Sequence, residues 1–315
     1  MRIIGTGSAL PKKIVTNEML SEFLDTSDEW ITTRTGITSR HIISDERLED
    51  LGAEAVMKAL DMAGLGVEDI DLFIVSNVVS EHITPGMSCV VAEKIGLSCP
   101  MVDINCACLG FIYALDMAET YYKAGKAKNV LIACIEEPSR MSSWKDRSTC
   151  VLFGDGAGAV VLTAGDNIKG TKLKAQPDTD KLFMRRVLEY NPYVNKAESD
   201  IPLQMRGREV FRFAVEACTH GVKGLLDEIG INKDDVSWFM VHQANKRIID
   251  SIIDFMQVPA DRFPVNIQDH GNSSSASCPI LLDECNRKGM FKEGDIIVLS
   301  AFGAGLLSGA AVLEW

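Results

Sequence analysis

The chain of 315 residues lacks the features that define membrane proteins and disordered proteins. No apolar run reaches the roughly 20 residues that a membrane-spanning helix requires. Hydrophobic residues make up 46% of the chain and charged residues 24%, which is the balance of an ordinary globular protein with a substantial core. We therefore expect a compact protein with no membrane association.

Positive charge is also in short supply. The chain has 32 Lys and Arg residues against 44 Asp and Glu residues, and its formal net charge is -12. A protein that binds nucleic acid must neutralise phosphates with a basic surface. We therefore expect no nucleic-acid partner, and an acidic protein partner would require a local basic patch.

The cysteines form no paired pattern. Nine are scattered without a C-x-x-C pair, and the five histidines are not paired either, so the sequence predicts neither a disulfide framework nor a metal site. The first residues, Met1 to Gly7, lack the basic and long apolar segments of a signal peptide. We expect reduced thiols, no bound metal and a cytoplasmic location.

Short apolar runs rich in β-branched residues alternate with longer segments whose apolar residues recur at helical spacing. Strands are predicted at Leu72–Ser76, Asn129–Cys134, Gly158–Thr163, Trp238–Val241, Ile296–Ser300 and Gly309–Leu313. Helices are predicted at Leu48–Ala63, Pro85–Ile95, Gly110–Ala124, Val210–Ile229, Ala244–Met256 and Cys278–Arg287. This alternation predicts an α/β fold with helices packed on a sheet.

The two halves of the chain resemble each other. Gly-rich segments at 153–158 and 302–305 each lead into an apolar strand, and glycine suits a sharp turn between antiparallel strands. In each half, a predicted strand precedes a helix start near Cys108 or Asn272 by about 30 residues, the separation of one strand-helix-strand unit. We predict two similar domains, residues 1–165 and 166–315. The polar stretch 166–204 breaks this pattern and is interpreted to include a long loop over a site.

Cys108 has a position that suits a nucleophile. A short strand leads into Cys106-Ala107-Cys108, and an apolar helix follows. At a helix N-terminus, unpaired N–H groups and the helix dipole stabilise a thiolate and lower the pKa of the thiol. Cys106 is interpreted as a packed structural thiol. The alternative for both cysteines is a small buried apolar side chain.

Two polar positions in the second half complete a candidate constellation. His242 leaves a predicted strand where a side chain can line a cleft, and Asn272 lies in a turn where its amide can donate to a substrate carbonyl. Each alone also fits a packed histidine or a serine-capped turn. Cys, His and Asn also occur together in papain-like proteases, but their matching positions in two similar α/β halves argue against a protease.

Eight sequence segments carry a resemblance to a known family over almost the whole chain. They are Gly5–Pro11, Thr26–Ile31, Arg34–Ile37, Cys108–Phe111, Phe153–Gly158, His242–Asn245, His270–Ser273 and Ala301–Gly303. In order and spacing they resemble 3-oxoacyl-[acyl-carrier-protein] synthase III, an acyltransferase of the thiolase superfamily that initiates bacterial fatty acid synthesis.

The resemblance implies a thiolase-like fold with a duplicated five-layered α-β-α-β-α architecture, a homodimer, and no metal or organic cofactor. Cys108 would take the acyl group from acyl-CoA. His242 and Asn272 would hold the thioester carbonyl of malonyl-acyl carrier protein while carbon dioxide leaves. The carbanion would then attack the acyl-cysteine, with the N–H groups of Cys108 and Gly305 as the oxyanion hole. The product would be 3-oxoacyl-acyl carrier protein.

The resemblance also assigns contacts to CoA. Trp30 and Arg147 match the pair that stacks on the adenine, an arrangement suited to an aromatic ring and a planar cation. Thr26, Arg34 and Asn245 fall on other positions that contact CoA.

Contacts to the carrier protein and to the acyl chain follow in the same way. Arg212 and Arg247 match basic residues that contact the acidic carrier, although either could simply solvate a helix face. Asp254 stands where some relatives have a Lys that binds the carrier, which opens two alternatives: the malonyl group is bound to another carrier, or it is bound to CoA. Thr84 stands where the partner subunit often contributes a Phe to the acyl pocket, and the smaller side chain predicts a longer or branched primer.

Two further departures lie beside the catalytic positions. Leu109 replaces the family's usual Ala, and Gly303-Ala304-Gly305 replaces a triple glycine.

Three alternatives stay open: a secondary-metabolite starter-condensing or acyltransferase relative that uses an unusual acyl-CoA, a catalytically silent subunit, and a thioester hydrolase. The presence of Cys, His and Asn together favours condensation.

Overall fold

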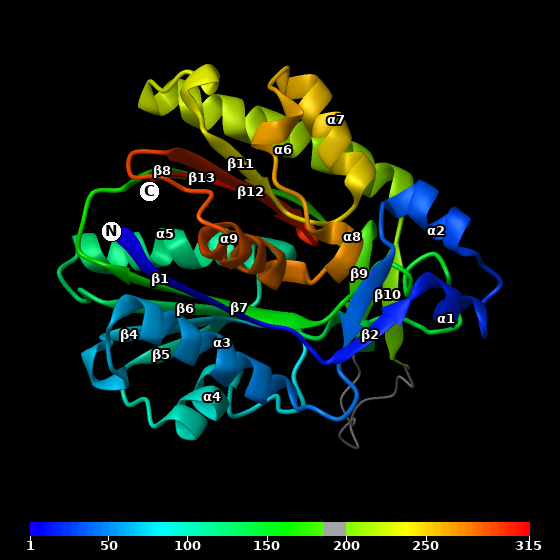
Figure 1. The fold of residues 1–315 in the computed structure, drawn as a ribbon, viewed down its shortest axis with the longest axis horizontal. Coiled ribbons are helices and arrows are strands. Elements are labelled where there is room, and N and C mark those ends of the chain that lie inside the picture. Colours follow the sequence, from blue (N-terminus) through cyan, green and yellow to red (C-terminus); the bar gives the residue numbers. More distant parts are fainter. Residues whose placement is uncertain (186–199) are drawn as a thin grey trace, which may run out of the picture.

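The computed structural model describes residues 1–185 and 200–315, and these form a layered α/β structure (Figure 1). Two sheets are its framework. The first has the spatial order β1-β7-β6-β4-β5, and the second has the order β11-β12-β13-β8. The strands of the first sheet are β1 (Arg2–Ala9), β4 (Leu72–Ser76), β5 (Met101–Ile104), β6 (Val130–Glu136) and β7 (Gly156–Thr163). Those of the second are β8 (Ile168–Asp178), β11 (Trp238–Val241), β12 (Ile296–Gly303) and β13 (Gly305–Glu314).

The second sheet repeats the pairing of four strands of the first. Strand β7 pairs antiparallel with both β1 and β6, and β6 pairs parallel with β4. Likewise β13 pairs antiparallel with both β8 and β12, and β12 pairs parallel with β11. Strands β4 and β11 are thus equivalent, and they are the strands that precede Cys108 and Asn272 by similar lengths of chain.

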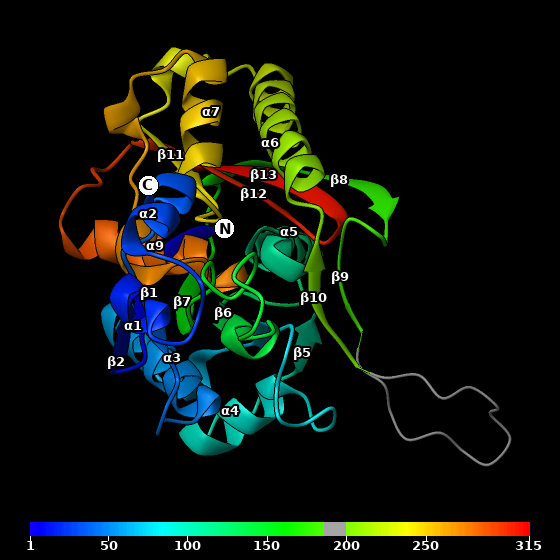
Figure 2. The same cartoon turned by 90° about the vertical axis from the view of Figure 1, so that its right-hand side faces the viewer.

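Helices form three layers around the two sheets (Figures 1 and 2). One pair covers the outer face of the first sheet, a second pair covers the outer face of the second sheet, and a third pair lies between the sheets. In this order the pairs are α3 (Leu48–Ala63) with α4 (Met87–Ile95), α6 (Gly207–Ile229) with α7 (Lys246–Met256), and α5 (Gly110–Lys123) with α9 (Ser277–Arg287). The predicted α-β-α-β-α architecture is confirmed.

The largest core lies between the two sheets, around α5 and α9. It includes Phe111, Ile280 and Leu299, each no more than 1% exposed. Full burial of an apolar side chain of this size stabilises the fold by roughly 1.5–3 kcal/mol. Since both faces of β6 and β7 are covered by helices, these strands are continuous apolar runs and do not alternate with polar residues.

The smaller elements lie mainly at the end of the layers where the α2, β9 and β10 labels stand in Figure 1. Strands β2 and β3 pair antiparallel, and so do β9 and β10. Their bounds are β2 (Lys13–Thr16), β3 (Ser39–Ile42), β9 (Leu182–Arg185) and β10 (Ile201–Met205), with short helices α1 (Asn17–Ser21), α2 (Asp28–Thr35) and α8 (Ile267–His270). Six 3-10 turns are also described: η1 (Val67–Asp69), η2 (Ala107–Leu109), η3 (Pro138–Arg140), η4 (Lys233–Asp235), η5 (Ala260–Arg262) and η6 (Ser274–Ala276).

The polar stretch 166–204 was predicted to break the pattern of strands and helices, but most of its described residues form strands. Strand β8 pairs with β13 along nearly its whole length, and β9 pairs with β10. Their polar residues lie on exposed or half-buried faces of edge strands, where an apolar run is not required. Residues 186–199 of the predicted loop lie outside the described residues.

One of the two Gly-rich segments also differs from its prediction. Residues 303–305 join β12 directly to the antiparallel β13, as expected for a sharp turn. Residues 153–156 do not form such a turn, because β6 already ends at Glu136, well before β7 begins. Within the part of the chain that the structure describes, no helix combines the length and apolarity needed to cross a membrane.

Candidate active site

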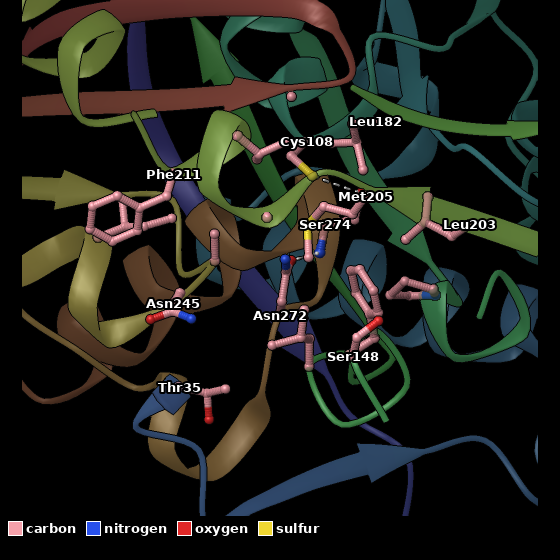
Figure 3. Close-up of a pocket in the computed structure, with 18 of the residues that line it drawn as sticks. Thr35, Cys108, Ser148, Leu182, Leu203, Met205, Phe211, Asn245, Asn272 and Ser274 are labelled. Atoms are coloured by element: carbon pink, nitrogen blue, oxygen red, sulfur yellow. Dashed lines mark hydrogen bonds between the residues drawn. The ribbon is translucent and has the colours of Figure 1, made fainter. Parts of the chain in front are cut away.

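A cavity of about 580 Å³ brings the three predicted chemical residues together. Cys108, His242 and Asn272 all line it, although they come from different halves of the chain. Figure 3 shows Cys108 and Asn272 beside Ser274. The rest of the cavity wall is largely apolar and includes Leu182, Leu203, Met205, Phe211 and Phe302. Such a cavity fits an apolar chain that ends at a polar reacting group.

Close packing holds the backbone around Cys108. Cys108 lies in η2, immediately before α5, as predicted. A Cβ on Gly110 would overlap Ser76 Oγ, and one on Gly303 would lie 2.9 Å from the backbone N of Cys108. Ala107 has a φ of 48°, a left-handed conformation that costs about 1–2 kcal/mol for a residue with a side chain. Surrounding packing must therefore maintain this turn.

The pKa of Cys108 differs from the sequence prediction. Burial of the thiol raises the pKa of Cys108 to about 12, and the negative charge of Glu136 adds to the rise. The prediction of a lowered pKa is therefore wrong for this structure. The position at a helix start was correct, but loss of hydration outweighs it because a thiolate is costly to bury.

His242 is held as a neutral imidazole. It follows β11, its backbone N–H donates to the carbonyl of Ser300 at 2.8 Å, and burial lowers the pKa of His242 to about 3. Its Nδ1 lies 2.6 Å from Ser277 Oγ, whereas its Nε2 has no hydrogen-bond partner among the described residues. When Ser277 donates to Nδ1, the single ring proton is on Nε2. In that tautomer Nε2 is a donor without a partner, at the cavity wall.

Asn272 is fixed by both halves of the chain. Its backbone N–H donates to Leu152 O at 2.8 Å, and its carbonyl accepts from Gly154 N at 3.2 Å. Its side-chain Oδ1 accepts from Ser274 N at 2.9 Å. Since this bond orients the amide, the NH2 group points away from Ser274 N and is the part of the side chain left for a ligand. These contacts also explain what the first Gly-rich segment does, which is to support Asn272.

Gly305 does not line the cavity. Gly303 and Ala304 do, while Gly305 begins β13 and pairs with Asp178. The predicted oxyanion-hole role of the Gly305 N–H stays a prediction. The close approach between the second Gly-rich turn and the nucleophile is made by Gly303, whose Cα faces the Cys108 backbone.

The residues predicted to clamp CoA adjoin one another at the cavity. The guanidinium carbons of Arg147 and Arg34 lie 5.0 Å and 4.5 Å from the centroid of the Trp30 ring, which is cation–π range. Ser27 caps α2, which carries Trp30 and Arg34. Asn245 also lines the cavity, and its amide donates to Arg34 O at 3.1 Å. All except Ser27 were predicted from the sequence.

The other predicted contact residues lie away from the cavity wall or at its rim. Thr26 and Thr84 are not lining residues; Thr84 is exposed, while Thr26 Oγ1 is buried with no partner among the described residues. Arg212 is 81% exposed and pairs with Glu216. Arg247 lines the cavity, with its guanidinium carbon 6.0 Å from the Phe211 ring centroid.

Several residues of the site were missed in the sequence. Ser274 and Ser277 contact Cys108 and His242, but a serine-rich turn predicts only capping. Glu136 ends an apolar strand and is completely buried. A charged residue at the end of an otherwise apolar strand was the sequence signal that could have identified Glu136 as part of the site. Within residues 1–185 and 200–315, no group of three His, Cys, Asp or Glu residues is arranged to hold a metal ion.

A five-layered fold with a cysteine, a histidine and an asparagine around one apolar cavity defines a thiolase-like acyltransferase of the condensing class. The families described as 3-Oxoacyl-[acyl-carrier-protein (ACP)] synthase III and 3-Oxoacyl-[acyl-carrier-protein (ACP)] synthase III C terminal match residues 102–180 and 226–315. The chain belongs to the 3-oxoacyl-[acyl-carrier-protein] synthase III family.

Relatives match the chain over its full length. The beta-ketoacyl-[acyl-carrier-protein] synthase III of Clostridium acetobutylicum is 42% identical over 320 residues, which cover 100% of this chain and 98% of the relative. That of Clostridium perfringens strain SM101 is 43% identical over 319 residues, or 99% and 98% of the two chains. The crystal structure of 3-oxoacyl-[acyl-carrier-protein] synthase III from Aquifex aeolicus VF5 superposes with a TM-score of 0.92 at 40% identity, covering 100% and 99%.

Proposed function

We propose that this protein condenses an acyl-CoA primer with malonyl-acyl carrier protein, with loss of carbon dioxide, and so initiates fatty acid synthesis. The observation that carries this proposal is the meeting of Cys108, His242 and Asn272 at one largely apolar cavity. The full-length relatives support it, and they do not favour the alternative of a starter enzyme from secondary metabolism.

The geometry supports distinct tasks for the three residues. Cys108 attacks the thioester of acyl-CoA, and CoA leaves as the acyl group becomes bound to sulfur. His242 Nε2–H and the Asn272 amide then donate to the thioester carbonyl of the malonyl group. Their donation stabilises the enolate formed as carbon dioxide leaves, and a fixed donor of this kind is worth about 10²–10³ in rate. The enolate attacks the acyl-cysteine, which releases the 3-oxoacyl product and the thiolate of Cys108.

The finer features of the proposal rest on individual contacts. Stacking of Trp30 with Arg147 and Arg34 supports adenine binding there, and Arg247 at the cavity rim supports contact with an acidic carrier. The proposal includes a homodimer in the cytoplasm that uses no metal or organic cofactor, since attack by the Cys108 sulfur and enolate stabilisation need only protein groups. The proposal also keeps the roles expected for four residues: CoA contact for Thr26, carrier contact for Arg212, primer selection for Thr84 and the oxyanion hole for Gly305.

The test separates the two half-reactions by mass spectrometry. Purified protein is incubated with acyl-CoAs from acetyl to octanoyl, including branched members, and malonyl-acyl carrier protein is then added. We expect a single adduct on Cys108 that is lost in Cys108→Ala. His242→Ala and Asn272→Ala should keep the adduct but condense on the order of 10²–10³ more slowly. An unmodified Cys108 with every donor would contradict the proposal, and an adduct that only hydrolyses would favour a thioester hydrolase.

A further inference from the structure

Glu136 is a buried carboxyl group that the mechanism above does not use. It is fully buried at the end of β6. Its Oε1 accepts from Ser275 Oγ at 2.5 Å and from Ser274 Oγ at 3.3 Å, and its Oε2 accepts from Val78 N at 3.1 Å. These partners are all neutral. A buried carboxyl group held only by neutral donors is well placed to gain and lose a proton.

Ser274 joins this carboxyl group to the nucleophile. Ser274 Oγ lies 3.6 Å from Cys108 Sγ, within range of a hydrogen bond that involves sulfur, and the contact is marked in Figure 3. An ionised carboxylate can only accept, so the Ser274 hydroxyl donates to Glu136. The thiol must then donate to Ser274 Oγ. The donors and acceptors therefore point in one direction, from Cys108 through Ser274 to Glu136.

Two other observations favour this route over His242. His242 Nε2 has no hydrogen-bond partner among the described residues, so it does not bond the thiol, and Nδ1 contacts Ser277. Ser274 also adopts a φ of 53°, and Ala107, immediately before Cys108, adopts 48°. One residue of the contact between η2 and η6, Ser274, and the residue that precedes the other are thus held in an uncommon conformation.

We propose that Ser274 and Glu136 form a proton relay that accepts the thiol proton of Cys108 during acylation, an inference that rests on the proposed function. As sulfur bonds to the acyl carbon, the S–H proton passes to Ser274 Oγ while the Ser274 proton passes to Glu136. CoA leaves with the electron pair of the broken C–S bond and takes a proton from solvent. When the later condensation step releases the Cys108 thiolate, Glu136 returns its proton through Ser274. The cycle consumes one solvent proton per turnover, as formation of carbon dioxide and CoA thiol from a malonyl carboxylate requires.

Among the described residues, the titratable groups that interact electrostatically with Glu136 are the thiols of Cys108 and Cys134. Cys108 comes from η2, Cys134 comes from β6 itself, and Cys278 of α9 lies beside both thiols. Burial raises the pKa of Glu136 to about 7, and the hydrogen bonds from Ser275, Val78 and Ser274 oppose the rise. Burial raises the pKa of each of these thiols well above that of Glu136. The change of charge near neutral pH in this cluster therefore belongs to the carboxyl group.

The test is the rate of Cys108 acylation measured by rapid quench and intact-protein mass spectrometry between pH 5.5 and 9. The acyl-CoA is the one that acylates the wild-type protein fastest. We expect the wild-type rate to rise with pH through an inflection near 7. Glu136→Gln should lose the inflection and acylate about 100-fold more slowly, within the range of general-base catalysis. Ser274→Ala should lose a similar factor, and the double variant should lose no more, because the two residues act as one unit.

Ser275→Ala is the matched control. It removes the other serine bond to the same oxygen of Glu136 but leaves the contact between Cys108 and Ser274. Since that bond favours the charged carboxylate, its loss should move the inflection to higher pH and leave the plateau rate within about 3-fold. Glu136→Asp keeps a titrating carboxyl group and should restore an inflection. It also carries the test if Glu136→Gln fails to fold.

The outcomes separate this relay from the proposed function. No adduct on wild-type Cys108 would overturn the function itself. A normal wild-type adduct together with an unchanged rate and inflection in Glu136→Gln would overturn only the relay. A loss of rate in Glu136→Gln with the wild-type inflection retained would show that Glu136 merely supports the turn, and this too would overturn the relay.

Discussion

At the scale of single residues, burial decides the protonation states in the cavity. Cys108 and His242 are both shifted away from their charged forms, because each would have to carry charge among apolar neighbours. A neutral His242 can donate one hydrogen bond and cannot serve as an imidazolium. Its contribution to the chemistry therefore depends on which nitrogen carries the proton, and Ser277 controls this choice.

Ser277→Ala tests that control. Removing the hydroxyl frees the Nδ1 atom of His242, so the ring proton is no longer directed to Nε2 and the donor to the enolate is weakened. A hydrogen bond is worth about 0.5–1.5 kcal/mol net, so we expect condensation to slow by roughly 2- to 10-fold. Acylation of Cys108 in the same sample is the internal control and should change less than about 2-fold. An equal loss in both half-reactions would instead indicate general damage to the fold.

At the scale of elements, glycines allow β12 to approach η2 closely, and the start of α5 to approach β4 and η6. The Cα of Gly303 faces the backbone of Cys108, and Gly110 faces Ser76 and Ser275. In contrast, Gly221 on α6 has no atom within 4 Å of the place a Cβ would take. The same substitution should therefore have opposite effects at these two kinds of position.

Gly303→Ala and Gly221→Ala make this comparison. The first places a methyl group against Cys108 N and should displace the nucleophile. We expect acylation to fall by about 100-fold, since an error of roughly 1 Å in placing reacting groups can cost that much. The second should stabilise α6 by about 0.5–1 kcal/mol, because alanine has the higher helix propensity. The acylation rate and the thermal unfolding temperature are measured for both variants. A fully active Gly303→Ala protein would contradict the packing argument.

At the scale of the whole molecule, one predicted determinant of the acyl chain lies outside the cavity. Thr84 is exposed and does not line the cavity of its own chain. Its proposed role in selecting the primer therefore requires a second copy of the protein, whose cavity it would enter. The size of its side chain should then set the length or branching of the accepted acyl group.

Thr84→Phe tests the dimer and the selectivity together. A phenyl ring that fills a neighbouring acyl cavity should lower kcat/KM for the longest accepted acyl-CoA by at least about 10-fold, which is within the range of steric discrimination in an apolar pocket. Activity with acetyl-CoA should be retained. Thr84→Ser is the matched control and should keep the wild-type preference. Light scattering gives the number of chains, and an unchanged preference in a Thr84→Phe dimer would contradict the role of Thr84.

The local sequence patterns were sufficient to predict most of the helices and strands of the layered fold. Leu48–Ala63, Leu72–Ser76 and Trp238–Val241 were predicted with both ends correct, because apolar spacing and turn residues are local properties. The same patterns indicated the helix start at Cys108 and the strand end at His242. Strand β8 was missed because an edge strand carries polar residues that resemble those of a loop.

Sequence alone determined the α/β layering, the duplication and the three chemical residues, since periodicity and motif spacing are properties of the chain. Only the tertiary structure decided how those residues are charged and connected. The raised pKa of Cys108, the orientation of His242 by Ser277 and the link from Ser274 to Glu136 all depend on burial and on contacts between residues far apart in the chain. Hydration is lost only when the two halves pack together, so no local pattern can encode its effect on a thiol or a carboxyl group.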